Sequence, residues 1–122
     1  PYRVLTLASG TTPLMPWLLD GLGPRGAWEP WVEMHPETAS ELGVGSARRI
    51  RVVSDHGSFT ARLHVFEGAQ PGLLNVPYGL HSSVGGWGSF EPFNPLSAVG
   101  ALRDPLSGLP NWYSTRARVE AA

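Results

Sequence analysis

The sequence predicts a mainly β domain of six short strands, closed into a small barrel and accompanied by one or two short helices and two long loops. Fifteen glycines and twelve prolines punctuate the 122 residues, which favours short strands and elaborate loops over long helices. The regular segments alternate apolar and polar residues with the period of two that strands have. Six short strands are more economically closed as a barrel than left open with exposed edges.

The chain has the size of one domain, and we expect residues 1–122 to form a single unit. The net charge is −1 and the basic residues are scattered, so no basic stripe predicts binding to nucleic acid. Direct membrane insertion is not expected, since no apolar run approaches the roughly 20 residues that cross a bilayer. With no cysteine, the chain offers neither a disulfide nor a cysteine-ligated cluster, and the sequence leaves its localisation undetermined.

Residues 2–8, "YRVLTLA", form the first expected strand, and residues 30–34, "PWVEM", form the second. Between them, "SGTTPLMPWLLDGLGPRGA" at residues 9–27 is a loop too long for a simple connector.

A helix of barely two turns is expected at residues 36–42. Pro36 suits the first helical turn, Ala39 and Leu42 form its apolar face, and Gly43 ends it. Isolated helices of fewer than about 12 residues are marginal in water. We therefore expect this helix to plug a barrel corner by burying Ala39 and Leu42.

A hairpin is expected from residues 48–54 and 58–66, turning near Gly57. Its second strand places alternate side chains inward, at Phe59, Ala61, Leu63 and Val65, and the intervening ones outward, at Thr60, Arg62 and His64.

A further strand is expected at residues 73–79, "LLNVPYG". The second long loop follows at residues 80–112, and a last strand at 113–121 alternates Thr115, Ala117 and Val119.

Four histidines are present, at positions 35, 56, 64 and 81, but none forms a helical metal clamp with another. We expect no metal site. His81, in a Gly- and Ser-rich loop, is the histidine best placed for ligand contact, and hydrogen bonding within the loop is the equal alternative. Glu37 and Glu41 are interpreted as a solvated helix face rather than an acid and base pair.

Glycine-rich "GVGS" and "SVGGWGS" match neither of the common phosphate-loop patterns. The loop at residues 79–94 nevertheless offers neutral donors to a polyanion, at Ser82, Ser83, Ser89 and Asn94. Four of the five tryptophans lie in or beside the long loops, either to pack against something large or to pin the loops to the barrel.

The order of these features resembles the C-terminal molybdopterin-dinucleotide-binding domain of the dimethyl sulfoxide reductase family of molybdenum and tungsten oxidoreductases. The resemblance runs from Val4 to Val119 and rests on "PWVEMHPETASELGV", "RIRVVSDHGSFTARLHV" and "FNPLSAVGALRDPLSGLPNWYSTRARV". "PWLLD" is most similar to the polysulfide, tetrathionate and arsenic oxyanion branch.

The resemblance implies a six-stranded double-psi β-barrel that covers the pterin and pyrophosphate of a molybdopterin guanine dinucleotide. Other domains would supply the metal ligand, and the implied partners are the remaining domains or subunits, including an iron–sulfur protein. Such enzymes are often periplasmic or membrane-associated. The residues implied to line the cofactor are Thr6, Ser9, Gly10, Thr11, His35, His81, Ser82, Asn94 and Tyr113. His35 stands at the family's usual Asn position, and Tyr113 where Lys or Gln is common.

On this interpretation the chain belongs to an enzyme but catalyses nothing alone. Two alternatives remain open at this stage. One is a cofactor-free structural domain of a respiratory electron-transfer complex, which the altered loop contacts permit. The other is a pyruvoyl-type decarboxylase, which shares this barrel and would cleave itself at Gly45-Ser46, Gly57-Ser58 or Gly88-Ser89.

Overall fold

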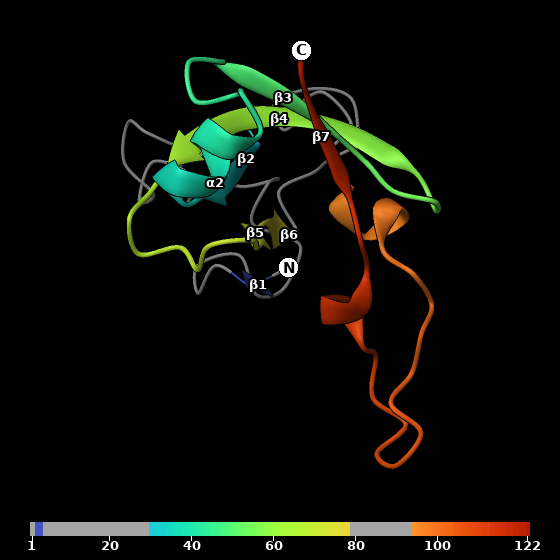
Figure 1. The fold of residues 1–122 in the computed structure, drawn as a ribbon. Helices are drawn as coiled ribbons and strands as arrows, with labels where there is room; N and C mark the ends of the chain where they lie inside the picture. Colours follow the sequence, from blue (N-terminus) through green and yellow to red (C-terminus); the bar gives the residue numbers. More distant parts are fainter. Residues whose placement is uncertain (1, 4–29, 79–93) are drawn as a thin grey trace, which may run out of the picture.

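A computed structural model describes residues 2–3, 30–78 and 94–122. Its main element is a five-stranded sheet of order β5-β2-β4-β3-β7, which curls into a half-barrel (Figure 1). The strands are β2 (Trp31–Met34), β3 (Arg49–Val53), β4 (Ser58–Val65), β5 (Leu74–Asn75) and β7 (Arg118–Ala121). The prediction of a mainly β domain with few helices is confirmed.

The expected hairpin is the centre of this sheet. β3 and β4 pair antiparallel from Arg49↔Arg62 to Val53↔Ser58, and the Ser54 amide donates to the Gly57 carbonyl across the turn. On its other edge β4 pairs with β2 in parallel, from Trp31↔Arg62 to Met34↔Val65. A parallel pair requires a crossover, and here the crossover contains the short helix and β3.

The short helix α2 (Pro36–Glu41) fills this crossover as expected, but with a different buried face. Ala39 is buried, whereas Leu42 is 48% exposed, so the prediction that Leu42 is buried is wrong. Leu42 is the C-cap rather than part of the helix, and the chain reverses at Gly43, whose φ is +67°. Val44, beyond the reversal, takes the buried position instead.

The core lies between the curled sheet and α2. The larger side chains with 0% relative exposure include Val32, Met34 and Ile50. Burial of such a side chain contributes about 1.5–3 kcal/mol. The buried residues of this cluster are Val32, Met34, Ala39, Val44, Ile50, Val52, Ala61, Leu63 and Val76.

Several strand boundaries differ from those expected. The strand expected at 73–79 is two short pieces, β5 and β6 (Pro77–Tyr78), and β6 pairs in parallel with β1 (Tyr2–Arg3) in a separate two-stranded sheet. The rest of the expected first strand lies outside the described residues. Val65, expected inward, is 40% exposed because it lies beyond the end of β3, whose pairing with β4 stops at Arg62.

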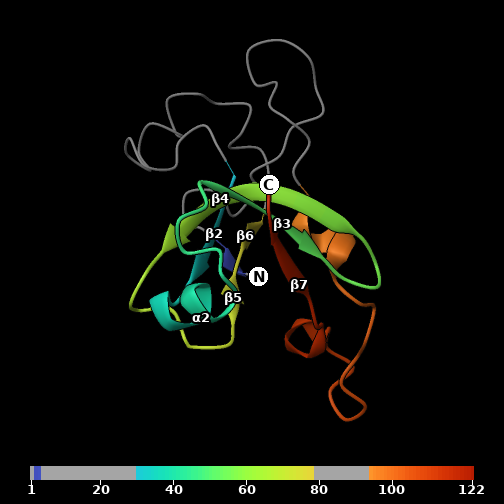
Figure 2. The same cartoon turned by 45° about the horizontal axis from the view of Figure 1, so that its top comes forward.

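The last expected strand begins late. Residues 112–114 instead form a 3-10 turn, η4 (Trp112–Ser114), because β7 pairs with β3 only from Arg118 onward. The described strands thus form a half-barrel and a separate pair, without a closed six-stranded barrel. Figure 2 shows β5 and β6 beneath the curve of the sheet, between α2 and β7.

A second 3-10 turn, η3 (Pro95–Ala98), packs on the tip of the β3–β4 hairpin. The Ser54 hydroxyl donates to the Ala98 carbonyl at 2.6 Å. Gly57 permits this approach, since a Cβ there would lie 2.7 Å from the Ser97 carbonyl oxygen. The hairpin tip therefore fixes the position of the segment that follows residue 94. No helix in the described ranges combines the length and apolarity that crossing a bilayer requires.

Candidate functional site

The concave side of the half-barrel encloses a cavity of about 530 Å³, which we call the trough. Its apolar wall includes Val52 and Phe59 of the sheet and Val76 beside β6. Its polar groups come from Asn75, Thr115 and Arg116. The complete lining is Val52, Phe59, Gly72, Leu73, Leu74, Asn75, Val76, Pro95, Ala98, Val99, Trp112, Thr115, Arg116 and Ala117.

Asn94 borders the trough. Its side-chain oxygen accepts from the Leu96 amide at 3.2 Å and so caps η3. The next residue, Pro95, is fully buried and lines the trough. The Asn94 side chain is exposed, and capping uses only its oxygen, so its amide nitrogen keeps two donors for a ligand.

Tyr113 lies within η4, directly after Trp112, which lines the trough. The Gly100 amide donates to the Thr115 hydroxyl at 3.1 Å, which joins the segment after η3 to the segment after η4. The structure therefore brings Asn94 and the backbone of Tyr113 to the border of one cavity. The position of the Tyr113 side chain lies outside what the structure describes.

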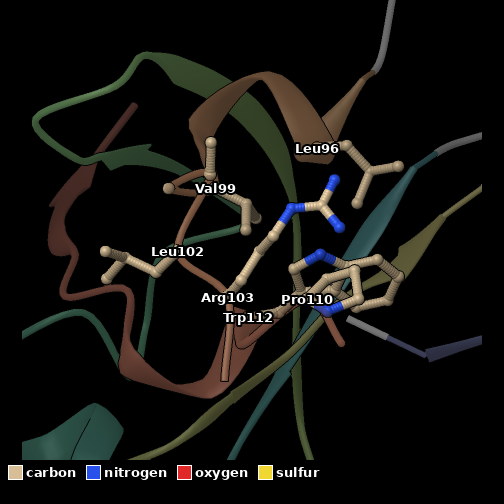
Figure 3. A pocket seen from close by; sticks show the side chains of 8 residues that line it. Leu96, Val99, Leu102, Arg103, Pro110 and Trp112 are labelled. Carbon is tan, nitrogen blue, oxygen red and sulfur yellow. The ribbon is translucent and has the colours of Figure 1, made fainter. Parts of the chain in front are cut away.

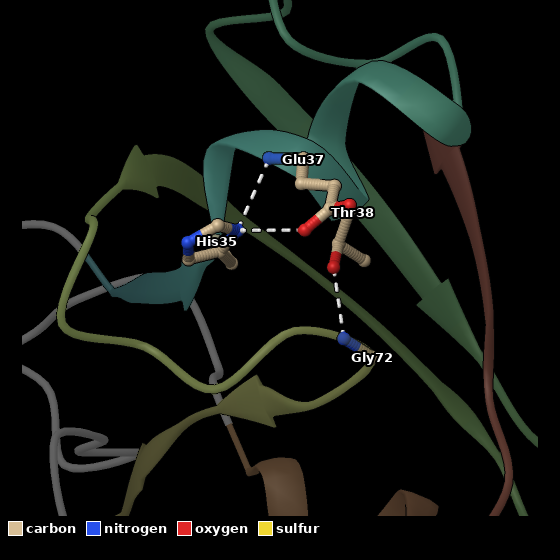
Figure 4. A network of polar contacts seen from close by, with 4 residues as sticks. All are labelled: His35, Glu37, Thr38 and Gly72. Carbon is tan, nitrogen blue, oxygen red and sulfur yellow. Dashed lines mark hydrogen bonds and ion pairs between the residues drawn. The ribbon is translucent and has the colours of Figure 1, made fainter.

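His35 lies elsewhere, at the start of α2. Its Nδ1 accepts from the Glu37 amide at 3.2 Å and so caps the helix (Figure 4). Because Nδ1 accepts, the proton of the neutral ring sits on Nε2, which can donate to a ligand. The Glu37 carboxylate lies 3.9 Å from Nδ1 and would form an ion pair only with a protonated ring.

The helix that His35 caps is tied to the trough by one hydrogen bond. The Thr38 hydroxyl accepts from the Gly72 amide at 2.8 Å, and Gly72 lines the trough. Figures 1 and 2 place α2 and η3, the orange turn, on opposite sides of β5 and β6. His35 is the N-cap of α2 and Asn94 is the N-cap of η3, so these two residues lie on different sides of the short strands. The other expected contacts, Thr6, Ser9, Gly10, Thr11, His81 and Ser82, lie outside the described residues.

Sequence reasoning missed the polar groups that line the trough itself, Asn75, Thr115 and Arg116. Arg116 is exposed and is the only cation of the trough among its described lining residues. One sequence signal was available: Arg116 follows by three residues Tyr113, the position at which the resemblance implies Lys or Gln. Across residues 30–78 and 94–122, His, Asp and Glu form no cluster of three or more that could hold a metal.

The Asp-Pro-Leu-Ser-Gly stretch of the resemblance forms a tight turn built on one carboxylate. Oδ1 of Asp104 accepts from the Leu106 amide at 2.9 Å, the Ser107 amide at 2.7 Å and the Ser107 hydroxyl at 2.9 Å. The hydrogen bonds from the Ser107 amide and hydroxyl, followed by that from Leu106, lower the pKa of Asp104. The motif is therefore explained by local structure and needs no ligand.

The chain matches a family model described as the molybdopterin dinucleotide binding domain over residues 22–115, more than half of its length. The chain belongs to this family. The domain type and cofactor class that the sequence resemblance implied are thereby confirmed, and the decarboxylase alternative is set aside.

Two relatives agree with this molybdopterin dinucleotide binding domain. A Halobacterium salinarum protein, provisionally named as the catalytic subunit of a dimethyl sulfoxide reductase, is 37% identical over 51 residues, which is 42% of this chain and 6% of that protein. Acetylene hydratase from Pelobacter acetylenicus superposes with a TM-score of 0.66 at 24% identity, over 84% of this chain and 15% of that one. The chain thus spans a small part of the length of each relative, and the hydratase supports the fold alone.

The groups of the trough suit a dinucleotide in chemical type. Arg116 can pair with a phosphate, Asn75 and Thr115 can bind neutral heteroatoms, and aromatic Phe59 and Trp112 offer faces to a ring system. Asn94, at the border of the trough, can donate from its amide nitrogen. Regular strands cannot supply such donors because their amides are already paired. The polar groups accordingly come from the ends of short strands and from loops.

Proposed function

We propose that this chain binds a molybdopterin guanine dinucleotide, carrying molybdenum or tungsten, as one domain of a larger oxidoreductase of the dimethyl sulfoxide reductase family. The observation that supports the proposal best is the trough, bordered by Asn94 and η4 and provided with the cation Arg116. The bound metal and pterin supply the redox chemistry, and the protein supplies binding and orientation.

The residues proposed to contact the cofactor are those implied by the sequence resemblance, with Arg116 added for a phosphate. They are Thr6, Ser9, Gly10, Thr11, His35, His81, Ser82, Asn94, Tyr113 and Arg116. His35 would use Nε2, since Nδ1 is occupied by the helix cap. Asn94 would use its amide nitrogen for the same reason.

The proposed complete fold is the six-stranded double-psi barrel. Two observations support this proposal: the trough lies on the concave side of the half-barrel, and β1 pairs in parallel with β6, the strand that follows β5. β5 and β6 are separated by Val76 alone, so β1 is carried next to the edge of the main sheet. A complete first strand at residues 2–8 would extend this pairing and close the barrel.

The implied partners are the remaining domains or subunits of the parent enzyme, including an iron–sulfur protein. The support is the length of the relatives, of which this chain spans 6% and 15%. The metal ligand would come from those partners. On this proposal the 122 residues alone show no oxidoreductase turnover.

The test uses the assembled parent enzyme and measures guanine nucleotide released on denaturation, together with metal content. Asn94→Ala and Arg116→Ala should each weaken cofactor binding, by about 1–3 kcal/mol for a buried partner left unsatisfied, or roughly 5- to 150-fold. His64→Ala is the matched control, because His64 lies exposed on β4 and stacks on Phe66 at 6.0 Å. Unchanged guanine and metal content in both variants would favour the cofactor-free structural domain instead.

A further inference from the structure

The tip of the β3–β4 hairpin, residues 54–57, is joined to η3 by one side chain. The Ser54 hydroxyl accepts from the amides of His56 and Gly57, at 3.1 and 3.3 Å. It donates to the Ala98 carbonyl at 2.6 Å. The Gly57 carbonyl lies 3.3 Å from the same hydroxyl, but a hydroxyl has a single hydrogen and the nearer oxygen takes it. Ser54 therefore orders the turn and holds η3 against it.

Two glycines allow the tip and the segment after η3 to come close together. A Cβ on Gly57 would lie 2.7 Å from the Ser97 carbonyl oxygen, and a Cβ on Gly100 would lie 2.7 Å from Nε2 of His56. Both distances are too short for a real side chain, so only glycine permits these two approaches. The hydrogen bond from Ser54 thus lies within a direct contact between the tip and residues 97–100.

Away from the tip, η3 borders two cavities. Pro95, Ala98 and Val99 line the trough. Figure 3 shows Leu96 and Val99 at a second pocket, of about 260 Å³. Atoms that line a cavity lack packing partners on that side and lose the corresponding dispersion contacts. A hydrogen bond to η3 therefore matters more for its position than the same bond would in a packed core.

The position of η3 sets the position of Asn94. The amide and the hydroxyl of Ser97 donate to the Asn94 carbonyl, at 3.1 and 2.7 Å. The Leu96 amide donates to the side-chain oxygen of Asn94 at 3.2 Å. Ala98, which Ser54 contacts, belongs to the same short turn. A displacement of η3 would consequently move both the backbone and the side chain of Asn94.

We infer that Ser54 is a positioning residue for cofactor binding, which contacts no ligand and acts through η3 on Asn94. The inference rests on the proposed function, in which the amide nitrogen of Asn94 contacts the cofactor. Ser54 itself lies outside the lining of the trough. A binding group must be held close to its productive geometry by the groups that support it. Loss of the Ser54 hydroxyl should therefore weaken the hold on the cofactor while leaving every contact residue in place.

The experiment follows the loss of guanine nucleotide from the assembled parent enzyme during repeated gel filtration. Ser54→Ala should lose the nucleotide roughly 3- to 10-fold faster than the wild type, which corresponds to about one net hydrogen bond.

Two control variants should keep the wild-type rate of loss. Ile50→Val removes one carbon from a fully buried core side chain outside the trough lining, and it destabilises the fold to a similar degree. Ser58→Ala removes an exposed hydroxyl of the same hairpin, which accepts from the Arg51 guanidinium at 3.2 Å.

A double variant and hydrogen exchange identify the route of the effect. If Ser54 acts through Asn94, adding Ser54→Ala to Asn94→Ala should not accelerate the loss further, because the two changes remove the same contribution. The Val99 amide donates to the Leu96 carbonyl and so closes η3. It should exchange faster in Ser54→Ala than in Ile50→Val, with the cofactor bound or removed.

Three outcomes would overturn this inference alone. Equal rates of nucleotide loss in Ser54→Ala and Ile50→Val would reduce the hydroxyl to a contributor to stability. Additive effects in the double variant would mean that Ser54 acts elsewhere than through Asn94. Unchanged exchange at Val99 would show that η3 keeps its place without the hydroxyl. A wild-type enzyme that contains no guanine nucleotide would instead refute the proposed function, and this inference with it.

Discussion

The Thr38 hydroxyl accepts a hydrogen bond from the Gly72 amide at 2.8 Å and thereby joins α2 to the turn before β5. Thr38 is only 8% exposed, and Gly72 has a φ of +78°. A helix of six residues has little stability of its own. This bond, with the burial of Ala39, is what holds it in the crossover.

Replacing Thr38 with valine should destabilise the protein by about 0.5–1.5 kcal/mol, because the part-buried hydrogen bond from the Gly72 amide is lost while the side-chain volume is kept. Chemical denaturation gives the free energy of unfolding. Thr38→Ser retains the hydroxyl and should recover most of the hydrogen-bond contribution. Equal destabilisation by Val and Ser would mean that packing of the methyl group, rather than the hydrogen bond, matters here.

Loss of the His35 cap should also weaken α2. His35→Ala removes the acceptor for the Glu37 amide, and loss of an N-cap costs about 0.5–2 kcal/mol. His35→Asn restores a strong capping side chain and should retain wild-type stability. Thermal unfolding of the three proteins measures this, and an Asn variant as unstable as the Ala variant would contradict the capping role.

The pKa of the Asp104 carboxyl should lie below its ordinary value of about 3.8, because the Ser107 and Leu106 hydrogen bonds favour the ionised carboxylate. A lowered folded-state pKa contributes stability that is present above the ordinary value and is lost as pH falls through the lowered one. The turn at residues 104–107 should thus loosen only below about pH 3.8. NMR titration of the carboxyl carbon and exchange of the Ser107 amide follow both effects.

Ser107→Ala removes the hydroxyl hydrogen bond and should raise the Asp104 pKa toward its ordinary value, while the amide bond stays. Ser46→Ala, at an exposed serine elsewhere, should leave the pKa unchanged. A Ser107 variant with the wild-type titration curve would show that the hydroxyl contributes nothing.

Gly57→Ala should separate η3 from the hairpin tip. A Cβ there would lie 2.7 Å from the Ser97 carbonyl oxygen, which belongs to backbone and cannot move cheaply. We expect a destabilisation of about 1–3 kcal/mol, as for other overpacked sites. Gly45→Ala is the control, since its nearest atom would be 3.8 Å away, and it should be neutral or slightly stabilising. Equal stability of the two variants in denaturation would refute this close approach.

Local sequence patterns were sufficient to predict the β3–β4 hairpin and α2, because these elements are formed by residues close together in the sequence. The alternation around Ala61 and Leu63 predicted the β3–β4 hairpin, because the period of side chains on a strand is set by the backbone. Pro36 and Gly43 bracketed α2 correctly, since the first lacks an amide that a helix start does not need and the second permits a reversal. The same ordered motifs carried the family resemblance.

Only the tertiary structure decided which faces these elements bury and which loops meet. Leu42 was expected inside on spacing alone, but the chain reverses beyond it and Val44 is buried instead. The parallel pairing of β2 with β4 and the seating of Ala98 on Ser54 join residues distant in sequence, and no local pattern specifies such contacts. The trough combines Asn75 with Arg116, and it exists only because the curled sheet brings the ends of separate segments together. Composition and residue spacing therefore determined the strands and the helix, whereas tertiary packing determined the site.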